Sequence, residues 1–517
     1  MIVRNFVSKS PVEPVDPVFP DPPPKLYQGV DTVRGEARSA IVKGGHTVSD
    51  SSTSQLLKVS VDYQSLAEST EINQSASVGV GLFGGSEKIS FVKEVERTSW
   101  SINMTIRSSY IIGKAEASQY ELDLTSFNFK DPAVRLDFFD HYGDSWISAV
   151  TLGSQYLGVF TFHLNSESEH KSVMTSLEAH GLLSAFSFNA DLQTKMSSFF
   201  SNTKVRATLS QTTFGVGPVA LPTFENMIEF ARKLPELPVV SPATLRTAVS
   251  GYESLAPHGA FAAVVKNRDY FVGSSFKKGV YADRTTINDQ INQLDAIHAI
   301  HDTYGHDEPE LRAAKQMAAD DLAKLDAQVE QYRENPERDF TNEKPALPSV
   351  KKGRPSVAFE SNFSPAWGGT GGGQFDDVGS VTEFISNHRR IYSLRMHSGD
   401  YVRCLTVKYK GADGEGEVEK IHGKQEDTRG QELFLEEGDS IGTLAGCSGA
   451  YIDELKIELR PSGKSISAGQ HRDLGKIDWS PEKNQTVIGF RGYSGAHLDG
   501  VQAVWVRFKP TIWKAPF

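Results

Sequence analysis

A glycine-rich stretch near the start of the C-terminal third carries groups that could bind a polar ligand. It reads WGGTGGGQFDD, residues 367–377, with five glycines among eleven residues and two carboxylates at its end. Glycine lets a backbone approach a ligand closely, and ionised carboxylates accept hydrogen bonds. Such a stretch is typical of a flexible linker, a phosphate-binding loop or one wall of a binding site, so its surroundings must decide.

Three later segments share one pattern, in which a Ser-Gly pair leads into an alternating strand. The pairs begin at Ser398, Ser448 and Ser494, so the spacings are 50 and 46 residues. Strands in every copy of a long repeat indicate β-sheet units packed together, because one unit cannot bury its own apolar face. The glycine-rich stretch is then predicted to form the first strand turn of a β domain. A linker is disfavoured, and so is a phosphate loop, because no helix and no Lys follow.

With WGGTGGGQFDD at its start and IGFRGYSGAHLDG at its end, the region from about 359 to 510 resembles the jacalin-related lectins. The resemblance implies a β-prism of three four-stranded Greek-key sheets around a pseudo-threefold axis. In that family a Gly-x-x-x-Asp loop faces the glycine-rich loop, and together the two loops hold a monosaccharide.

The last repeat, GAHLD, matches that loop motif. The resemblance implies that Asp499 accepts hydrogen bonds from sugar hydroxyls, while the backbones of Ala496, His497 and Gly372 donate to them. This division of roles suits a sugar, because its hydroxyls both donate and accept. The ring of His497 could also lie against the sugar face. The alternative is a β-prism that serves only for packing.

The other two repeats depart from the pattern. GAYID keeps the motif, so Ala450, Tyr451 and Asp453 form a second candidate site, although the facing segment GQHRDLGKIDW has no Gly-Gly pair. In the first repeat Arg403 replaces the aspartate, and a cation cannot accept a hydroxyl proton. We expect that site to be inactive.

The segment HYGDSWISAVTLGSQY resembles the signature of the membrane-attack-complex/perforin (MACPF) superfamily, which reads aromatic-Gly-Thr-His-aromatic, six residues, Gly-Gly. The matching residues are Tyr142, Gly143, Trp146 and Gly153. The departures from the signature are Asp144, Ser145 and Ser154. The resemblance implies a bent four-stranded antiparallel sheet with two helical clusters, each of which unfolds into a membrane-spanning β-hairpin.

Two inserts stand at the corresponding places, at about 66–97 and 165–203, and Gly215 and Gly217 follow the second. On this resemblance Gly143, Gly153, Gly215 and Gly217 would act as a hinge, because glycine lets the sheet bend or its neighbours approach closely during opening. Residues 76–82 and 186–192 alternate apolar with small or polar residues, as barrel strands of about 9–11 residues do. The second insert also has a helical pattern. A switch from helix to hairpin requires segments compatible with both periods, although ordinary amphipathic surface segments give the same pattern.

The predicted fold class is α+β, with an N-terminal MACPF domain before an all-β jacalin-like prism. Two long helices are expected within 222–345, and the Pro-rich, basic segment that follows them is predicted to be a linker. The predicted boundaries are a Pro-rich tail at 1–24, a MACPF domain at 25–345 with a helical tail at 222–345, a linker at 346–358 and a β-prism at 359–517.

Composition limits the function classes. The formal net charge of −11 argues against a general nucleic-acid binder, which needs a basic surface. There is no run of about 18 apolar residues and no signal-peptide core. We expect a protein made in soluble form that is secreted or released by another route and acts on a target membrane. Cys404 and Cys447 are compatible with one disulfide or two free thiols.

No catalytic constellation is evident, so we expect no enzyme, no cofactor and no bound metal. The segment HAIHDTYGHDE gathers His298, His301, His306, Asp302 and Asp307. A metal site is conceivable there, because His298 and His301 share a helical face. We favour a solvated helix end.

The functional hypothesis is a pore-forming toxin or defence protein, similar to insecticidal or defence MACPF proteins of bacteria and ferns. Its β-prism would bind a glycan or glycolipid, its subunits would assemble into a homo-oligomeric ring, and two hairpins from each would enter the lipid bilayer. The alternative is a non-lytic carbohydrate-binding protein in which the MACPF module serves assembly or adhesion.

Overall fold

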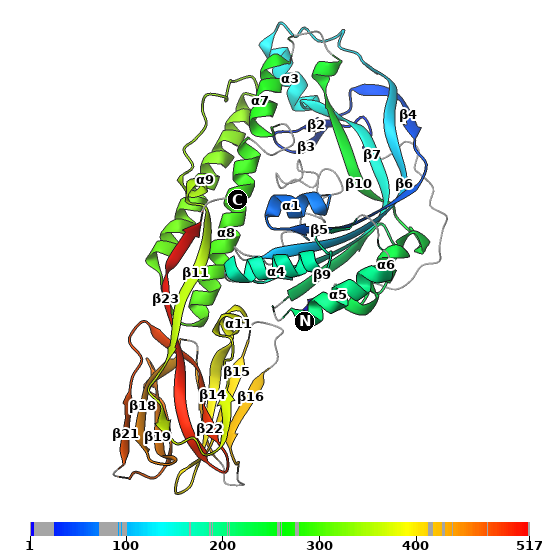
Figure 1. Cartoon of the computed structure of the whole chain (residues 1–517). Coiled ribbons are helices and arrows are strands. Elements are labelled where there is room, and N and C mark those ends of the chain that lie inside the picture. The colour runs from blue at the N-terminus through cyan, green and yellow to red at the C-terminus, as the bar shows by residue number, and fades with distance from the viewer. Residues whose placement is uncertain are drawn as a thin grey trace.

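A computed structural model gives the fold. The structure describes residues 2–4, 25–71, 91, 95, 101–164, 167–185, 188, 190–203, 205, 207–255, 259, 261–273, 279–411, 417–425, 430–436, 438–472 and 474–514. Its N-terminal part combines one long-stranded sheet with helices, and its C-terminal part is a smaller body of three sheets (Figure 1). The expectation of a mixed chain with an all-β C-terminal part is confirmed. The predicted tail at 1–24 lies outside the described residues except for the short strand β1 (Ile2–Arg4).

The N-terminal sheet has ten strands, of which β6 and β7 form the centre. Two strands pair in succession along β6, and two others pair in succession along β7, so the main body of the sheet is four strands wide, and the short strands β1 and β8 extend it beyond β9 and β5. These pairings are all antiparallel. The bounds are β4 (Val42–Val48), β5 (Ser52–Ser60), β6 (Ile102–Leu122), β7 (Ser145–Phe162), β9 (Ala207–Phe214) and β10 (Ala243–Gly251).

The sheet bends where β9 gives way to β10 beside β7. Gly153 pairs with both Ile111 and Ala243, and the register on β6 shifts just after Ile111. A methyl group on Gly153 would overlap the carbonyl of Tyr110, and one on Gly215 would overlap the carbonyl of Gly153. Gly215 also has a φ of 72°, which favours glycine. The two glycines therefore allow the strands to pass closely at the bend.

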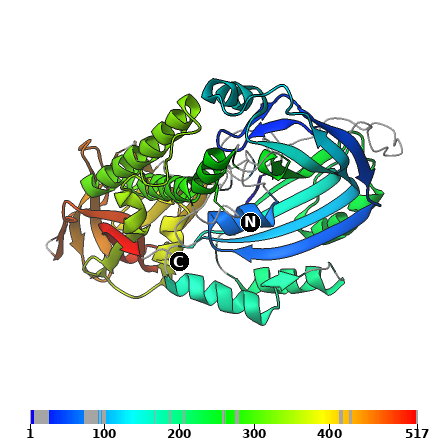
Figure 2. The ribbon, with the colours of Figure 1, turned by 90° about the horizontal axis from the view of Figure 1, so that it is seen from above.

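Two helical segments cover opposite faces of this sheet. The helix α1 (Tyr63–Ser69) packs Leu66 against Leu157 and Val159 of β7. On the other face, α4 (Glu167–Ala179) and α5 (Ala190–Asn202) pack on a cluster that includes Phe160 of β7. The opposite faces follow from the period of two along a strand. Figure 2 shows the long strands curving past α1.

The two predicted inserts therefore contain helix in their described parts. Residues 72–90 of the first insert, with the alternating stretch 76–82, lie outside the described residues. In the second insert, the short strand β8 (Ser184–Ala185) pairs with β5, and residues 190–192 begin α5 rather than continue a strand.

The remaining described elements of the N-terminal part are short strands of the same sheet and the helices around it. The longest are α8 (Val280–Thr303) and α9 (Pro309–Glu334), the two helices expected from the sequence, and they pack side by side through an apolar cluster. The others are β2 (Gly29–Asp31), β3 (Glu36–Arg38), α3 (Pro132–Tyr142), η2 (Phe224–Asn226), α6 (Met227–Arg232), η3 (Leu234–Glu236), η4 (Tyr252–Ser254) and α7 (Ala262–Phe271). Among the described residues, no helix is long and apolar enough to cross a membrane.

The segment predicted to be a linker, residues 346–358, is packed and structured. It forms α10 (Pro348–Lys352) and the start of β11 (Arg354–Phe363). Gln290 of α8 donates to the carbonyls of Ser349 and Gly353 at 2.9 and 2.7 Å. Asp321 of α9 accepts from the amide and the hydroxyl of Ser349 at 2.8 and 2.7 Å. These polar side chains from the helix pair bind the backbone and hydroxyl groups of the segment, while Leu347 packs in the apolar cluster of α8 and α9.

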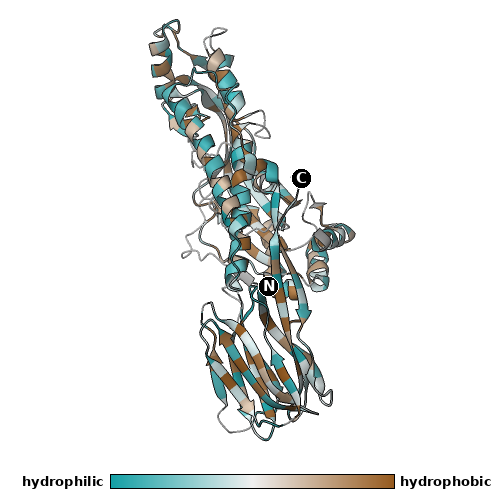
Figure 3. Cartoon of the chain, turned by 90° about the vertical axis from the view of Figure 1, so that its left-hand side faces the viewer, coloured by the Kyte–Doolittle hydropathy of each residue, from teal (hydrophilic) through white to brown (hydrophobic). Residues whose placement is uncertain are grey.

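Three sheets around one apolar core form the C-terminal body, as the repeat predicted. Their orders are β11-β23-β22-β13 with β12 beside β23, β16-β15-β14-β17, and β20-β19-β18-β21. Hydrophobic and hydrophilic residues alternate along the strands (Figure 3). Cys404 and Cys447 are buried free thiols. The bounds are β12 (Trp367–Gly368), β13 (Gly373–Asp376), α11 (Val381–Ser386), β14 (Arg390–Ser398), β15 (Val402–Lys410), β16 (Val418–Gly423), β17 (Gln431–Phe434), β18 (Ser440–Ser448), β19 (Ile452–Arg460), β20 (Ser465–Gly469), β21 (Gly475–Trp479), β22 (Gln485–Ser494) and β23 (Leu498–Lys514).

Candidate functional site

The glycine-rich loop and the turn between β22 and β23 meet at Asp499. A methyl group built on Gly372 would lie 2.5 Å from Oδ2 of Asp499 and would overlap the carbonyl of Ser494. From the other side, a methyl group on Gly495 would lie 3.5 Å from the same oxygen. Asp499 is 5% exposed, and its Oδ2 is buried without a hydrogen-bond partner. The structure therefore brings Gly372 next to the Asp499 carboxylate, as predicted. Oδ2 of that carboxylate remains able to accept hydrogen bonds from a ligand.

The loop before Gly372 is fixed to the same turn by its backbone. The amide of Gly369 donates to the carbonyl of Asp499 at 2.8 Å. Gly368 has a φ of 81°, and a methyl group on it would overlap that same carbonyl. A methyl group on Gly369 would lie 2.5 Å from the carbonyl of Ala450, in the next repeat. The close approach of three backbone segments explains why this stretch is so rich in glycine.

Ala496 and His497, the predicted backbone donors, lie in the turn that precedes Asp499. Ala496 is exposed and His497 is partly exposed. The turn is closed by the amide of Gly495, which donates to the carbonyl of His497 at 3.0 Å. Both predicted donors therefore stand beside the carboxylate at a surface that a ligand can reach.

The second candidate site differs in its electrostatics. Asp453 is 2% exposed, and Nε of Arg472 lies 3.5 Å from its Oδ1. Arg472 is held there, because it also donates to the hydroxyl of Tyr401 at 3.2 Å and stacks over its ring. The predicted members Ala450 and Tyr451 lie in the turn before Asp453. A guanidinium that already occupies one carboxylate oxygen leaves less acceptor capacity here than at Asp499.

In the first repeat, the side chain of Arg403 fills the space beside the turn. A methyl group on Gly399 would overlap Nε of Arg403. Asp453 and Asp499 thus each keep a buried Oδ2 without a hydrogen-bond partner, but only Asp453 is paired with an arginine, and the first repeat has an arginine in place of the aspartate.

One feature of this surface was not predicted. Tyr401, Tyr451 and His497 form a cluster, with ring centroids 5.1 to 5.6 Å apart. Each ring stands three residues after the serine of a Ser-Gly pair, and equivalent positions converge near a threefold axis. The alignment of the three repeats therefore already places the three rings at equivalent positions. The cluster places polar-tipped rings directly beside the Asp499 turn.

The residues of the predicted MACPF signature surround the start of β7. Trp146 is 1% exposed and stacks on Tyr27 with centroids 5.7 Å apart. Gly143 has a φ of 78° and ends α3 just after Tyr142, whose carbonyl accepts from the hydroxyl of Tyr252 at 3.0 Å. These contacts give the signature residues packing roles at one end of the sheet.

The glycines assigned to a hinge lie elsewhere on the sheet. Gly153 and Gly215 meet at the bend, as described above. Gly217 follows, where its amide donates to the carbonyl of Pro238 at 3.1 Å.

Near the signature, Asp144 is buried and accepts a 2.9 Å hydrogen bond from the amide of Thr32. Burial, together with the charge of Asp144, raises the pKa of neighbouring Asp31 to about 7. This acidic pair is a packed feature of the fold beside the end of α3, away from the glycine-rich loop.

The histidine-rich end of α8 is not the solvated helix end that the sequence favoured. His301 is 1% exposed, and its ring packs against Phe508 of β23 with centroids 5.0 Å apart. His298 remains exposed and lies 3.4 Å from Asp302. The burial comes from a strand about 200 residues away, which the local sequence does not reveal.

Three sheets around one apolar core, with a Gly-x-x-x-Asp turn facing a glycine-rich loop, define a β-prism of the lectin type. Residues 364–504 match the family described as "Jacalin-like lectin domain". The expected jacalin-like domain is thereby confirmed. The matched segment begins at residue 364, so the helices and long strands before it lie outside the match.

Solved structures similar to this chain include plant lectins. They are the wild-type Malaysian banana lectin (16% identity, covering 28% of this chain and 98% of that one), a mannose-binding lectin from Champedak (19%, 29% and 97%), and a mannose-specific jacalin-related lectin from Morus nigra in complex with mannose (20%, 28% and 94%), each with a TM-score of 0.24. No curated protein matches the chain. The domain assignment rests on the family match and on the three sheets.

Proposed function

We propose that the β-prism binds a hexose of a membrane glycan at Asp499. The observation that carries this proposal is the buried, unpartnered Oδ2 of Asp499 between Gly372 and Gly495. An ionised carboxylate without a partner is costly to bury unless a donor completes it. A sugar supplies such donors as adjacent hydroxyls, and the glycine backbones leave room for its ring. Because a similar lectin from Morus nigra is described as mannose-specific, mannose is the first sugar to test.

Binding of methyl α-mannoside and methyl α-galactoside, measured by isothermal titration calorimetry, tests this proposal after a glycan-array screen. Asp499→Asn keeps the size of the side chain but removes its charge. Loss of charged hydrogen bonds costs about 1.5–3 kcal/mol, so affinity should fall about 10- to 150-fold. The matched control is Asp400→Asn, an exposed aspartate in the equivalent turn of the first repeat. If Asp499→Asn binds the sugar as tightly as the unchanged protein, the assignment of Asp499 to the sugar site is wrong.

We further propose that the N-terminal part is a pore-forming module of the MACPF type. Support comes from where the two helical segments leave the sheet. Residues 61–101 join β5 to β6, and residues 163–206 join β7 to β9. The strand ends are neighbours, since Ser60 pairs with Asn103, Ile102 with Phe162, and Phe162 with Ala207. Two hairpins formed by these segments would therefore extend the four neighbouring strands beyond the same end of the sheet.

The lengths of the two segments suit this refolding. They hold 41 and 44 residues, counted as 101 − 60 and 206 − 162. A tilted barrel strand needs about 9–11 residues to cross the hydrocarbon core, so each segment could supply two strands and a turn. A single hairpin would leave unpaired backbone groups in lipid, so copies must close into a barrel. Several prisms bound to one membrane would add avidity to a ring of subunits. No enzymatic step forms part of this proposal.

Dye release from liposomes that carry the preferred sugar tests the pore. A matched pair of cysteine substitutions, Ser69→Cys with Thr105→Cys, would lock α1 to β6, because the two hydroxyl oxygens lie 2.7 Å apart. We expect the locked protein to bind the liposomes without releasing dye, and reduction of the disulfide to restore release. Binding by the unlocked protein without dye release or rings would favour the non-lytic alternative. Equal release by the locked and reduced forms would exclude refolding of α1.

A further inference from the structure

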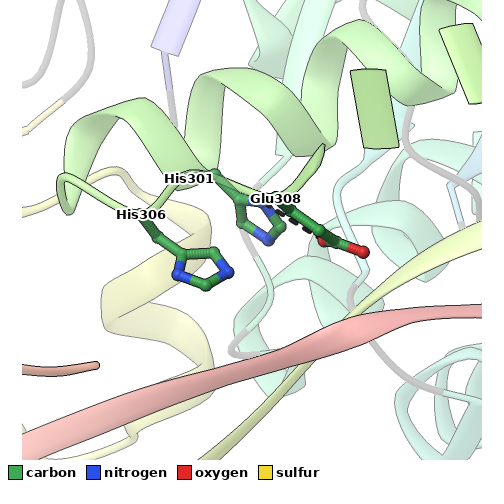
Figure 4. Close-up of side chains that lie close together, drawn as sticks. All are labelled: His301, His306 and Glu308. Atoms are coloured by element: carbon green, nitrogen blue, oxygen red, sulfur yellow. Dashed lines mark ion pairs between the residues drawn. The ribbon is translucent and has the colours of Figure 1, made fainter. Parts of the chain in front are cut away.

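The turn between α8 and α9 gathers three metal-ligating side chains against the β-prism. His301 lies in the last turn of α8, His306 lies in the turn itself, and Glu308 precedes α9 (Figure 4). One ligand atom from each lies within 4.8 Å of the others. Nδ1 of His301 and Oε2 of Glu308 are 3.6 Å apart. In a tetrahedral zinc site with bonds of about 2.1 Å, ligand atoms lie about 3.4 Å apart, so this pair is already near that spacing.

The environment of His301 is the one expected of a metal ligand. Its side chain is 1% exposed, and neither ring nitrogen has a hydrogen-bond partner. Leaving a buried polar group unpaired costs about 1–3 kcal/mol, so an ordinary packed histidine would be satisfied by a donor or acceptor.

Residues of β23 hold the other two side chains in place. Thr511 donates from its amide to Oε1 of Glu308 at 2.7 Å and from its hydroxyl to Oε2 at 2.9 Å. A carboxylate has about four acceptor positions, so both oxygens keep capacity for a metal. Phe508 packs against both histidine rings, with centroids 5.0 and 5.4 Å away. Hydrogen bonds that orient a ligating carboxylate are a regular feature of metal sites.

We propose that His301, His306 and Glu308 bind a divalent transition-metal ion, with Zn²⁺ as the preferred ion and water as the fourth ligand. Two imidazoles and a carboxylate suit Zn²⁺ better than Mg²⁺ or Ca²⁺, which prefer oxygen ligands. Because Glu308 is fixed to Thr511, the ion would fasten the end of the helix pair to the prism strand β23. The site is separate from the sugar turn and does not depend on it.

The test uses the full chain without a histidine tag, stripped with a chelator and titrated with Zn²⁺ by calorimetry. Co²⁺ serves as a spectroscopic probe of tetrahedral coordination. We expect one ion per chain and a rise in the melting temperature on binding. His306→Gln carries the test, because His306 lies in the turn and is only partly buried, whereas a change at buried His301 could disturb folding. The matched control is His298→Gln, on the exposed side of the same helix.

The expected results distinguish the metal ligands from the residues around them. Thr511→Val should weaken binding about 10- to 100-fold, as loss of an orienting partner does. His306→Gln should weaken it by more than Thr511→Val, and His298→Gln should leave it unchanged. The proposal is overturned if the stripped protein takes up no stoichiometric Zn²⁺, or if His306→Gln binds as tightly as the unchanged protein. Equal losses from His306→Gln and His298→Gln would also overturn it, because they would indicate adventitious binding by surface histidines.

Discussion

Glu71 should control how firmly the first helical segment is docked on the sheet. It follows α1 and lies 2.8 Å from Arg107 of β6, in a pair whose side chains are 11% and 8% exposed. It also pairs with Arg246 of β10 and accepts from Gln155 of β7 at 3.3 Å. Arg107 in turn donates to the carbonyl of Ser69 at 2.7 Å. One carboxylate thus joins the end of α1 to three strands.

Glu71→Gln removes the charge and keeps the shape. Breaking a buried ion pair from one side costs about 3–5 kcal/mol, because the partner charge stays buried. We take the lower end, about 3 kcal/mol, since glutamine can still accept a hydrogen bond and the side chain of Arg246 is 45% exposed. At about 1.4 kcal/mol per factor of ten, local opening of α1 should become about 150-fold more frequent.

Hydrogen exchange of the amides in α1 and early β6 measures this opening. Exchange in the prism strands serves as an internal reference and should not change. Glu68→Gln is the matched control on the same helix, because its pair with Lys58 is partly exposed and 3.7 Å long. Exposed pairs contribute about 0.2–1 kcal/mol, so that change should be small. Equal exchange in the two variants would refute the role assigned to Glu71.

Two further outcomes follow from the structure. Gly372→Ala should weaken sugar binding by about tenfold or more, since a shifted Asp499 carboxylate loses charged hydrogen bonds worth about 1.5–3 kcal/mol. Gly373→Ala is the control, because its methyl group would lie 3.8 Å from its nearest contact. Equal affinities of the two variants in calorimetry would contradict the role given to the contact between Gly372 and Asp499. Because the pKa of Asp31 is raised to about 7, its contribution to stability is present below about pH 4 and is lost as the pH rises through 7. Burial raises the pKa of Asp144 as well, so Asp144→Asn removes both its own titration and the charge that helps raise the pKa of Asp31. Chemical denaturation should therefore show the unchanged protein losing more stability than the variant between pH 5 and 8, and parallel losses would exclude a contribution from this acidic pair.

Three packed β-sheet units could be predicted from the sequence because their pattern is local and repeated, whereas the β-prism itself was implied by the resemblance to a family. Each Ser-Gly turn and each alternating strand appears three times in the sequence, and the threefold arrangement brings equivalent turns together. The contact between Gly372 and Asp499 joins residues far apart in the chain, and only the resemblance to a family suggested it. The cluster of Tyr401, Tyr451 and His497 was overlooked, although the same alignment contained it.

The two misjudged segments depended on contacts between distant parts of the chain. The prolines and basic residues of 346–358 predicted a linker, yet Gln290 and Asp321 bind its backbone and hydroxyl groups. The aspartates around His301 predicted a solvated helix end, yet Phe508 covers that ring. In both segments the burial is imposed by elements that no sequence window includes.

The central claim is that Asp499 completes a sugar site, and one calorimetric comparison tests it most directly. The preferred hexose should bind the unchanged protein and Asp400→Asn with equal affinity. It should bind Asp499→Asn about 10- to 150-fold more weakly, while neither variant melts at a lower temperature than the unchanged protein. Equal binding by all three proteins, or no binding of any hexose to the unchanged protein, would contradict the account.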